Sequence, residues 1–338
     1  MVSIIIPTFN RKEWLRETLA SLVQQTWPSE HYEVIIVSDG STDGTEEIAQ
    51  EVYPFRLHYL WQINQGDAAA RNLGARQSQG KTLVFLDDDI ILEKNFLVQL
   101  LAVQDAYPNG IVVGTDILWL TETNPLLEGA TAPSARPGSP NQEPIPFADV
   151  CSNNMSIRRD AYFAIGMMES LGFAGSNIWC DVDFSYRAYY KGFEFIRSKR
   201  ALCWHRDYVS RSLNSQIKRW REAAYRAVVL FQKYPDLVHH LPMFTDKTPI
   251  VFHHDSPGLI ARKLFRRISS SRITTFMMEK IVSLLPNYRF LDRFAHLLSR
   301  WIIGGHIFQG YWEGLRDFGP INVSQDSAVP ALPGRNTS

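Results

Sequence analysis

The sequence predicts an α/β fold with a largely parallel central sheet, followed by a helical and basic C-terminal region. In the first 116 residues, short apolar runs rich in β-branched residues alternate with segments of helical period, which is the pattern of strands connected by helices. Polar clusters follow several of these runs, and in open sheets of this kind ligands bind beyond the carboxyl ends of the strands. Past residue 211 the sequence becomes helical in period and rich in basic side chains.

The expected strands are short apolar runs, and the expected helices carry apolar residues three or four positions apart. Strands are expected at residues 3–6, 33–37, 57–61, 82–86 and 111–116. Helical spacing is present at 14–22, 69–76, 160–165, 181–190, 215–234 and 257–285. Gly192 ends the helix at 181–190, since glycine is the usual residue just past a helix.

A proline-rich stretch interrupts this pattern between residues 121 and 147. Its six prolines prevent a continuous helix or a central strand. A loop of that length predicts a lid, a substrate-facing loop or a mobile insertion. The final residues, 323–338, are small, polar and proline-containing, which predicts a disordered tail.

The charge of the chain is balanced in total but not along its length. The 338 residues hold 35 Lys and Arg, 35 Asp and Glu, and 45% hydrophobic residues, which excludes a wholly disordered, collagenous or uniformly basic nucleic-acid-binding chain. Residues 1–150 carry 9 basic and 20 acidic side chains, a net charge of −11, whereas residues 151–338 carry 26 and 15, a net charge of +11.

The cysteines and the first apolar run bear on the compartment. Cys151, Cys180 and Cys203 are odd in number and lack CxxC spacing, so they indicate neither a disulfide framework nor a zinc ribbon, and a reducing cytosol fits best. The run that begins at Val2 is closed by Pro7, which is too short for a signal-peptide core or a membrane span. We therefore expect a cytoplasmic protein.

The strongest chemical feature is an apolar strand that delivers three consecutive carboxylates, Asp87, Asp88 and Asp89. Like charges this close repel one another, so the arrangement is costly unless a cation neutralises it. A hard divalent ion with oxygen ligands is the natural solution, and substrate phosphates often complete its coordination. The alternative is a solvated acidic turn before a helix that starts near Glu93, where negative charge is mildly favourable.

A second apolar strand ends in Asp39-Gly40-Ser41. Asp39 could accept hydrogen bonds from a base or a ribose. Alternatively, Ser41, Thr42 or Asp43 caps the next helix, and both interpretations can hold together.

Several motifs, taken in order, resemble the family 2 glycosyltransferases of the GT-A fold. They are Pro-Thr-Phe-Asn-Arg at 7–11, Ser-Asp-Gly-Ser-Thr-Asp at 38–43, Asn-Gln-Gly at 64–66 with Ala-Arg-Asn-Leu-Gly at 70–74, and Leu-Asp-Asp-Asp at 86–89. Further on, residues 179–184 with Arg187 and Gly192 resemble the family's Glu-Asp-x-Asp-Leu-x-x-Arg segment, and His205 stands where many members carry a metal-binding histidine. The resemblance covers about residues 2–207.

The resemblance implies that the first half of the chain binds a nucleoside-diphosphate sugar. Thr8 and Arg11 would lie near the nucleotide, Asp39 near the base and ribose, and Arg71 near the ribose or a phosphate. The implied donor contacts are Pro7, Thr8, Arg11, Asp39, Gly66, Arg71, Asp87 and Asp88. Asp87 and Asp89 match the family's Asp-x-Asp motif, so these two and His205 would bind Mg²⁺ or Mn²⁺, with Asp89 as a direct ligand.

Asp181 matches the general base of the family. A carboxylate within hydrogen-bond reach can take the proton of a sugar hydroxyl as it attacks the anomeric carbon from the side opposite the diphosphate. Attack from that side implies inversion of configuration. Asp183, Trp179 and Asn153 are the expected acceptor contacts. The alternative for Asp181 and Asp183 is a carboxylate pair that stabilises a helix N-terminus, and Trp179 could equally form part of the core.

Two positions depart from the family pattern. Ser38 replaces an acidic residue that commonly precedes Asp39, and this weakens any inference about the base. Cys180 replaces the glutamate that commonly precedes the base, and this leaves the class of acceptor open. A buried, inert thiol is the expected state of Cys180.

The expected organisation is a GT-A catalytic domain at 1–211, a helical basic region at 212–322 and the tail at 323–338. Within the first domain, residues 1–116 would bind the donor, 121–147 form the loop, and 148–211 carry the base and acceptor region. The expected acceptor is a hydroxyl of a glycan or a lipid-linked saccharide.

The basic 257–285 helix predicts either contact with an anionic membrane surface, at the cytoplasmic face, or simple packing on the catalytic domain. No nucleic-acid-binding motif accompanies its charge. The rival functions are a nucleotidyltransferase acting on sugar phosphates and a non-catalytic nucleotide-sugar-binding scaffold.

Overall fold

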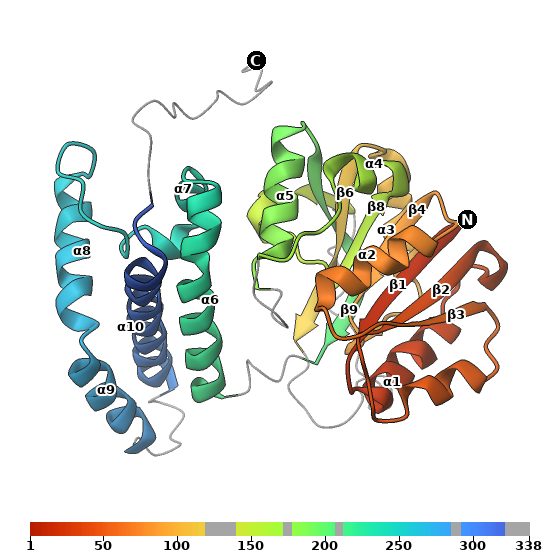
Figure 1. The fold of residues 1–338 in the computed structure, drawn as a ribbon, viewed down its shortest axis with the longest axis horizontal. Helices are drawn as coiled ribbons and strands as arrows, with labels where there is room; N and C mark the ends of the chain where they lie inside the picture. The colour runs from red at the N-terminus through yellow and green to blue at the C-terminus, as the bar shows by residue number, and fades with distance from the viewer. Residues whose placement is uncertain (119–139, 172–177, 207–211, 285–291, 322–338) are drawn as a thin grey trace. The chain divides into compact units, whose positions relative to one another are not determined.

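The computed structural model describes residues 1–118, 140–171, 178–206, 212–284 and 292–321, and Figure 1 shows the course of the chain. Its contacts divide the chain into two compact units, residues 1–207 and 208–338. The first unit combines one sheet with helices, and the described part of the second unit is helical. The predicted α/β class with a helical C-terminal extension is confirmed.

The sheet of the first unit has a parallel half and a mixed half. In the parallel half, β1 (Val2–Thr8) lies between β2 (Tyr32–Ser38) and β4 (Thr82–Leu86), and β3 (Arg56–Trp61) pairs with β2. The mixed half continues from β4 through β8 (Asn154–Arg158), β6 (Gly110–Leu118), β9 (Glu194–His205) and β5 (Ile90–Leu92), and β7 (Gln142–Pro144) also pairs with β9. All five predicted strands are present.

Helices cover both faces of this sheet. On one face, α1 (Lys12–Val23) and α3 (Phe96–Ala106) pack their apolar residues against Ile4, Ile6 and their neighbours in a single core. On the other face lie α2 (Asp67–Gln77), α4 (Arg159–Ile165) and α5 (Cys180–Tyr190). There Gly74 of α2 lies against Ile5, and the ring of Tyr162 lies between those of Phe85 and Phe184, with centroids 5.0 and 5.2 Å away.

The loops of the first unit differ from the expectation in two places. The helix expected after Asp43 is a 3₁₀ helix, Thr45–Gln50, and two further 3₁₀ turns lie at Ser29–His31 and Phe147–Asp149. The proline-rich stretch, expected as loop throughout 121–147, contributes the edge strand β7, which ends at Pro144, the kind of position where a strand tolerates proline. The rest of that stretch up to residue 139, and the predicted tail at 323–338, lie outside the described residues.

The second unit is built around two long helices, α6 (Leu213–Lys233) and α10 (Asp292–Phe318). Gly310 and Gly314 allow the two helices to approach so closely that a Cβ at either position would collide with a backbone carbonyl oxygen of α6. The unit also contains α7 (Leu237–His240), a 3₁₀ turn at Pro242–Phe244, α8 (Pro257–Ser269) and α9 (Arg272–Leu284), and Figure 1 shows α8 and α9 following one another along α10. Among the helices of the described residues, none combines the length and apolarity that a membrane crossing requires.

The prediction of a single amphipathic helix at 257–285 is wrong in one respect, because two helices, α8 and α9, occupy this stretch. The break falls at Ser270–Ser271, where the Ser271 hydroxyl accepts a hydrogen bond of 3.1 Å from the backbone N–H of Thr274 and caps the start of α9.

Candidate active site

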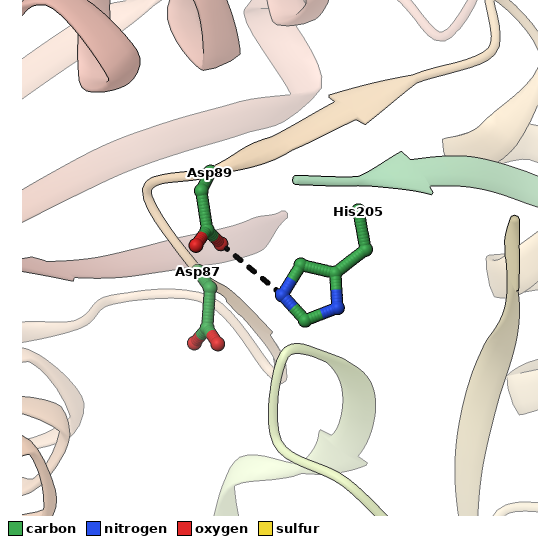
Figure 2. Close-up of side chains that lie close together, drawn as sticks. All are labelled: Asp87, Asp89 and His205. Atoms are coloured by element: carbon green, nitrogen blue, oxygen red, sulfur yellow. Dashed lines mark ion pairs between the residues drawn. The ribbon is translucent and has the colours of Figure 1, made fainter. Parts of the chain in front are cut away.

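The chemically interesting side chains gather at the carboxyl ends of the parallel strands. Asp87 follows β4, Asp89 precedes β5, and His205 ends β9. Because β5 and β9 pair antiparallel with Ile90 opposite His205, the imidazole is brought beside Asp89 although 116 positions separate the two residues. Figure 2 shows the three side chains converging from these elements.

The three residues form a candidate metal site. One ligand atom from each of Asp87, Asp89 and His205 lies within 4.8 Å of the others, and Asp89 Oδ1 is 3.5 Å from His205 Nε2. Asp89 Oδ1 is also buried and accepts no hydrogen bond from the described residues. Carboxylate oxygens and an imidazole nitrogen suit a divalent cation, and an otherwise orphaned buried oxygen is the atom such an ion would satisfy.

The pKa of His205 reflects the excess of negative charge at this site. Burial alone would lower the pKa of His205, but the nearby Asp89 carboxylate, followed by the charges of Asp87 and Asp116, raises it to about 9. At neutral pH the imidazolium therefore supplies positive charge between the carboxylates. A metal ion would replace that proton, because a ligating histidine must be neutral.

Asp88, between the two candidate ligands, makes different contacts. Its Oδ2 accepts a hydrogen bond of 2.8 Å from the Thr8 hydroxyl and its Oδ1 one of 3.0 Å from Arg11. Burial raises the pKa of Asp88 to about 7, against the charge of Arg11. Both of its oxygens thus join the end of β1 to the end of β4. The predicted contact of Asp88 with the nucleotide sugar stays a prediction.

Arg11 is the exposed cation at this edge. Its guanidinium lies 3.2 Å from Asp89 Oδ2 and 4.8 Å from the centre of the Trp14 ring, and 45% of its side chain is exposed. A guanidinium held in this way can meet an anionic ligand on its exposed side.

Arg71, in contrast, lies inside the protein. It is 2% exposed and donates hydrogen bonds to Asp67, on its own helix, and to Asp87. Since a buried charge requires a partner, the two carboxylates and Arg71 fix one another. In this structure Arg71 orients a candidate metal ligand.

Asp39 organises the loop before α2. Its carboxylate accepts hydrogen bonds from the Gln62 side chain (2.6 Å) and from the backbone N–H groups of Gln65 (2.9 Å) and Gly66 (2.8 Å). Gly66 has φ +92°, a conformation that favours glycine. These contacts give Asp39 and Gly66 a structural role in the loop. Both residues also lie at the edge of the sheet where the nucleotide is predicted to bind.

The loops after β1 and β2 are tied together next to this edge. The Asn10 side chain accepts a hydrogen bond of 2.8 Å from the backbone N–H of Thr42, and the Ser41 hydroxyl accepts one of 3.0 Å from that of Asn10. Pro7 is buried at the end of β1. Ser38, which replaces an acidic residue of the family pattern, accepts a hydrogen bond of 3.2 Å from the backbone N–H of Ser41.

Asp181, the predicted base, lies in the first turn of α5 and is half-buried. Two thiols flank its carboxylate: Cys151 Sγ lies 3.7 Å from Oδ2, and Cys180 Sγ lies 3.7 Å from Oδ1. Burial raises the pKa of Cys180 well above its ordinary value, as expected for an inert thiol. Trp179 caps this helix with φ +76°, a strained value for a bulky residue of the kind found at functional sites.

The predicted acceptor contacts Asp183 and Asn153 lie inside the protein. Asp183 is 0% exposed and pairs with Arg187 at 2.8 Å. Arg187 in turn donates to the carbonyl oxygens of Ile165 and Met167, so Asp183 fixes α5 to the end of α4. Asp183 therefore holds the fold in this structure, and its acceptor contact stays a prediction.

Asn153 belongs to a buried network that the sequence did not reveal. Asn153 is 2% exposed. Its backbone carbonyl oxygen accepts a hydrogen bond of 3.0 Å from the backbone N–H of Asp87, and its side-chain amide donates one of 2.7 Å to Asp116. Asp116 also accepts from Asn154 and, at 3.1 Å, from Cys203. The one signal for Asp116 was its place at the carboxyl end of a predicted strand.

The mostly parallel sheet flanked by helices has the predicted GT-A fold. Residues 3–165 match the sequence model of the family described as Glycosyl transferase family 2.

Two relatives are similar to a part of this chain. The chain is 43% identical to glycosyltransferase AglE of Haloferax volcanii over 91 residues, which are 26% of this chain and 30% of that protein. It is 36% identical to validoxylamine A glucosyltransferase of Streptomyces hygroscopicus subsp. limoneus over 105 residues, 30% of this chain and 23% of that protein. The chain thus spans less than a third of the length of either relative.

The fold is also similar to that of the mannosyltransferase PcManGT from Pyrobaculum calidifontis, solved with GDP-Man and Mn²⁺. The TM-score is 0.57 at 16% identity, over 92% of this chain and 87% of the other. At this identity the likeness shows the fold alone.

Proposed function

We propose that the chain is an enzyme that transfers a sugar from a nucleoside-diphosphate sugar to an acceptor hydroxyl, with a divalent cation held by Asp87, Asp89 and His205. The observation that carries the proposal is the convergence of these three ligands within 4.8 Å, where no donor from the described part of the chain forms a hydrogen bond with Asp89 Oδ1. The family of residues 3–165 supports sugar transfer as the reaction. We assign the activity to a catalytic domain at residues 1–211.

The cation, Mn²⁺ or Mg²⁺, would act as a Lewis acid toward the leaving diphosphate when bound. Other residues of the chain hold the proposed ligands in position. Arg71 holds the Asp87 carboxylate through a hydrogen bond, and the pairing of β5 with β9 holds His205 beside Asp89. His205 would have to be neutral to serve as a ligand of such an ion.

The donor would lie along the carboxyl ends of β1, β2 and β4. Arg11 contributes the exposed guanidinium that can pair with the diphosphate, while Thr8 and Asp88 hold Arg11 and β1 in position. Asp39 and Gly66 shape the adjoining loop, where the base and ribose are proposed to bind.

Asp181 is the proposed general base. An ordinary sugar hydroxyl is a poor nucleophile, and the carboxylate would take its proton as the oxygen attacks the anomeric carbon on the face opposite the diphosphate, inverting the configuration. The two thiols that contact Asp181 are weak donors, so they leave the carboxylate able to accept that proton. The proposed acceptor is a glycan or a lipid-linked saccharide, with Trp179 beside it.

The test is release of the nucleoside diphosphate from a panel of nucleotide sugars, with saccharide acceptors, in Mn²⁺, Mg²⁺ or EDTA. Release should require the metal. Asp181→Asn should abolish transfer and retain Mn²⁺-dependent donor binding, whereas Asp89→Asn should lose both. Asp160→Asn, at an exposed carboxylate on α4, is the matched control and should behave as wild type. Absence of metal-dependent turnover with every donor and acceptor, or full transfer by Asp181→Asn, would overturn the proposal.

A further inference from the structure

Two consecutive helices of the second unit turn large apolar side chains toward solvent. The side chains are 47–75% exposed and come from both α8 and α9: Leu264, Phe265, Ile268, Ile273, Phe276, Met277 and Ile281. We call this set the α8–α9 apolar surface. Scattered apolar residues on a surface need no explanation, but seven on two adjoining helices mark an interaction site.

The orientation of α8 makes this exposure unusual. Lys263 is 5% exposed, and its ammonium lies 2.7 Å from Asp255 and 2.9 Å from the Pro249 carbonyl oxygen. Arg266 likewise turns inward and donates to Asp246 at 3.1 Å. The helix thus directs two charged residues inward and its apolar residues outward, the reverse of a helix that covers a core.

The charge beside the apolar surface has one sign. The segment 257–284 carries six basic residues and a single acidic one, Glu279, which pairs with His306 at 2.7 Å. Arg262, Arg267, Arg272 and Lys280 are exposed. A second copy of this surface would bring like charges together, and a nucleic acid would gain nothing from the apolar residues, whereas an anionic lipid bilayer offers both negative headgroups and an apolar interior.

We propose that α8 and α9 dock on the surface of an anionic phospholipid bilayer. The α8–α9 apolar surface enters the boundary between headgroups and acyl chains, and the exposed basic residues meet the headgroups. The structure changes which residues serve this role compared with the sequence-based expectation, because Lys263 and Arg266 are engaged inside the unit. The inference goes beyond the proposed sugar transfer and does not depend on it.

Vesicle flotation tests the proposal directly. The full chain should float with vesicles that contain phosphatidylglycerol and phosphatidylcholine, and much less with phosphatidylcholine alone. Phe265→Ser with Ile268→Ser should lower the partition coefficient at least tenfold. Replacing Arg262 and Arg267 by Gln should lower it roughly fivefold per residue at low salt, and less at high salt.

The matched control removes exposed apolar side chains elsewhere. Val23→Ser with Val52→Ser, at sites 45% and 98% exposed in the first unit, should leave flotation unchanged. Circular dichroism establishes that each variant is folded, and diphosphate release with a soluble acceptor should be the same for the Phe265/Ile268 variant as for wild type, which separates membrane docking from catalysis.

Three outcomes would overturn the proposal. One is failure of the wild type to float with anionic vesicles. The second is undiminished flotation of the folded Phe265/Ile268 variant. The third is a wild-type dimer in sedimentation velocity that this variant dissociates without lipid present, since the surface would then be an interface between copies.

Discussion

Replacing Arg71 by methionine tests how the candidate metal site is built. Methionine retains a long apolar side chain in a fully enclosed position but removes the guanidinium that joins Asp67 to Asp87. Arg71 is 2% exposed, so water cannot take its place without rearrangement. The Asp87 carboxylate would then remain near Asp89 with no fixed cation of its own.

The magnitude follows from how far each partner is buried. Removing one partner of a fully buried ion pair costs about 3–5 kcal/mol. The side chains of Asp87 and Asp67 are 30% and 36% exposed, so water screens the carboxylates and we expect a loss of about 1–3 kcal/mol. In a domain of roughly 200 residues each kcal/mol shifts the melting temperature by about 2–4 °C, so we expect a decrease of about 2–12 °C. Asp87→Asn in the Arg71→Met background should recover part of this loss, because the carboxylate that was left unpaired is gone.

The assay is urea and thermal unfolding followed by circular dichroism, with and without Mn²⁺. Arg76→Met is the matched control, since Arg76 lies on the same helix and is exposed. The cation should stabilise Arg71→Met more than wild type, because it neutralises Asp87. If Arg71→Met unfolds within 1 kcal/mol of Arg76→Met, the guanidinium is not what holds this edge of the sheet, and our account of Asp87 is incorrect.

Two further predictions concern packing and acid stability. Gly74→Ala should destabilise the first unit by about 1–3 kcal/mol in urea unfolding, because the new Cβ would lie 2.5 Å from Ile5 Cγ2, whereas Gly258→Ala, with open space around it, should be neutral; equal stability of the two variants would contradict this. Burial alone would raise the pKa of Asp255, but hydrogen bonds from Lys263 and from the Val251 N–H lower it below its ordinary 3.8. Asp255 therefore stabilises the second unit above about pH 4, and this contribution is lost as the pH falls through the lowered pKa. Urea unfolding between pH 3 and 6 should show a smaller acid-induced loss for Asp255→Asn than for wild type.

The regular elements of the sheet could be predicted because their signals are local. The run at 34–37 is apolar throughout, which indicates a strand buried on both faces, and the structure has β2 there. The same local reasoning located α2 and α5 from apolar residues at helical spacing. The carboxyl-edge position of Asp87 and Asp89 followed from the order of strands and helices alone.

The partners of the site residues could not be predicted, since they depend on contacts between distant segments. Nothing near Asp88 in the sequence indicates that Thr8 and Arg11 occupy its two oxygens. The inward turn of Asp183 likewise depends on Arg187 and on carbonyl oxygens at the end of α4. A carboxylate in a motif can thus bind a ligand or hold the fold, and only the three-dimensional contacts distinguish these roles.

The acidic triplet illustrates why the two roles occur side by side. If all three carboxylates faced the cation, the site would hold more negative charge than one divalent ion offsets, and the surplus would be costly wherever water is excluded. The structure divides the charge instead. Asp88 is matched by Arg11, which also pairs with Asp89 Oδ2, and Asp87 is matched by Arg71. Among the described residues, the cationic group that faces Asp89 Oδ1 is the imidazole of His205. Because His205 can release its proton and the two arginines cannot, the positive charge that an incoming metal ion can displace is the one that faces Asp89 Oδ1. The arginines therefore keep the edge of the sheet folded in either state, and the histidine makes the site exchangeable.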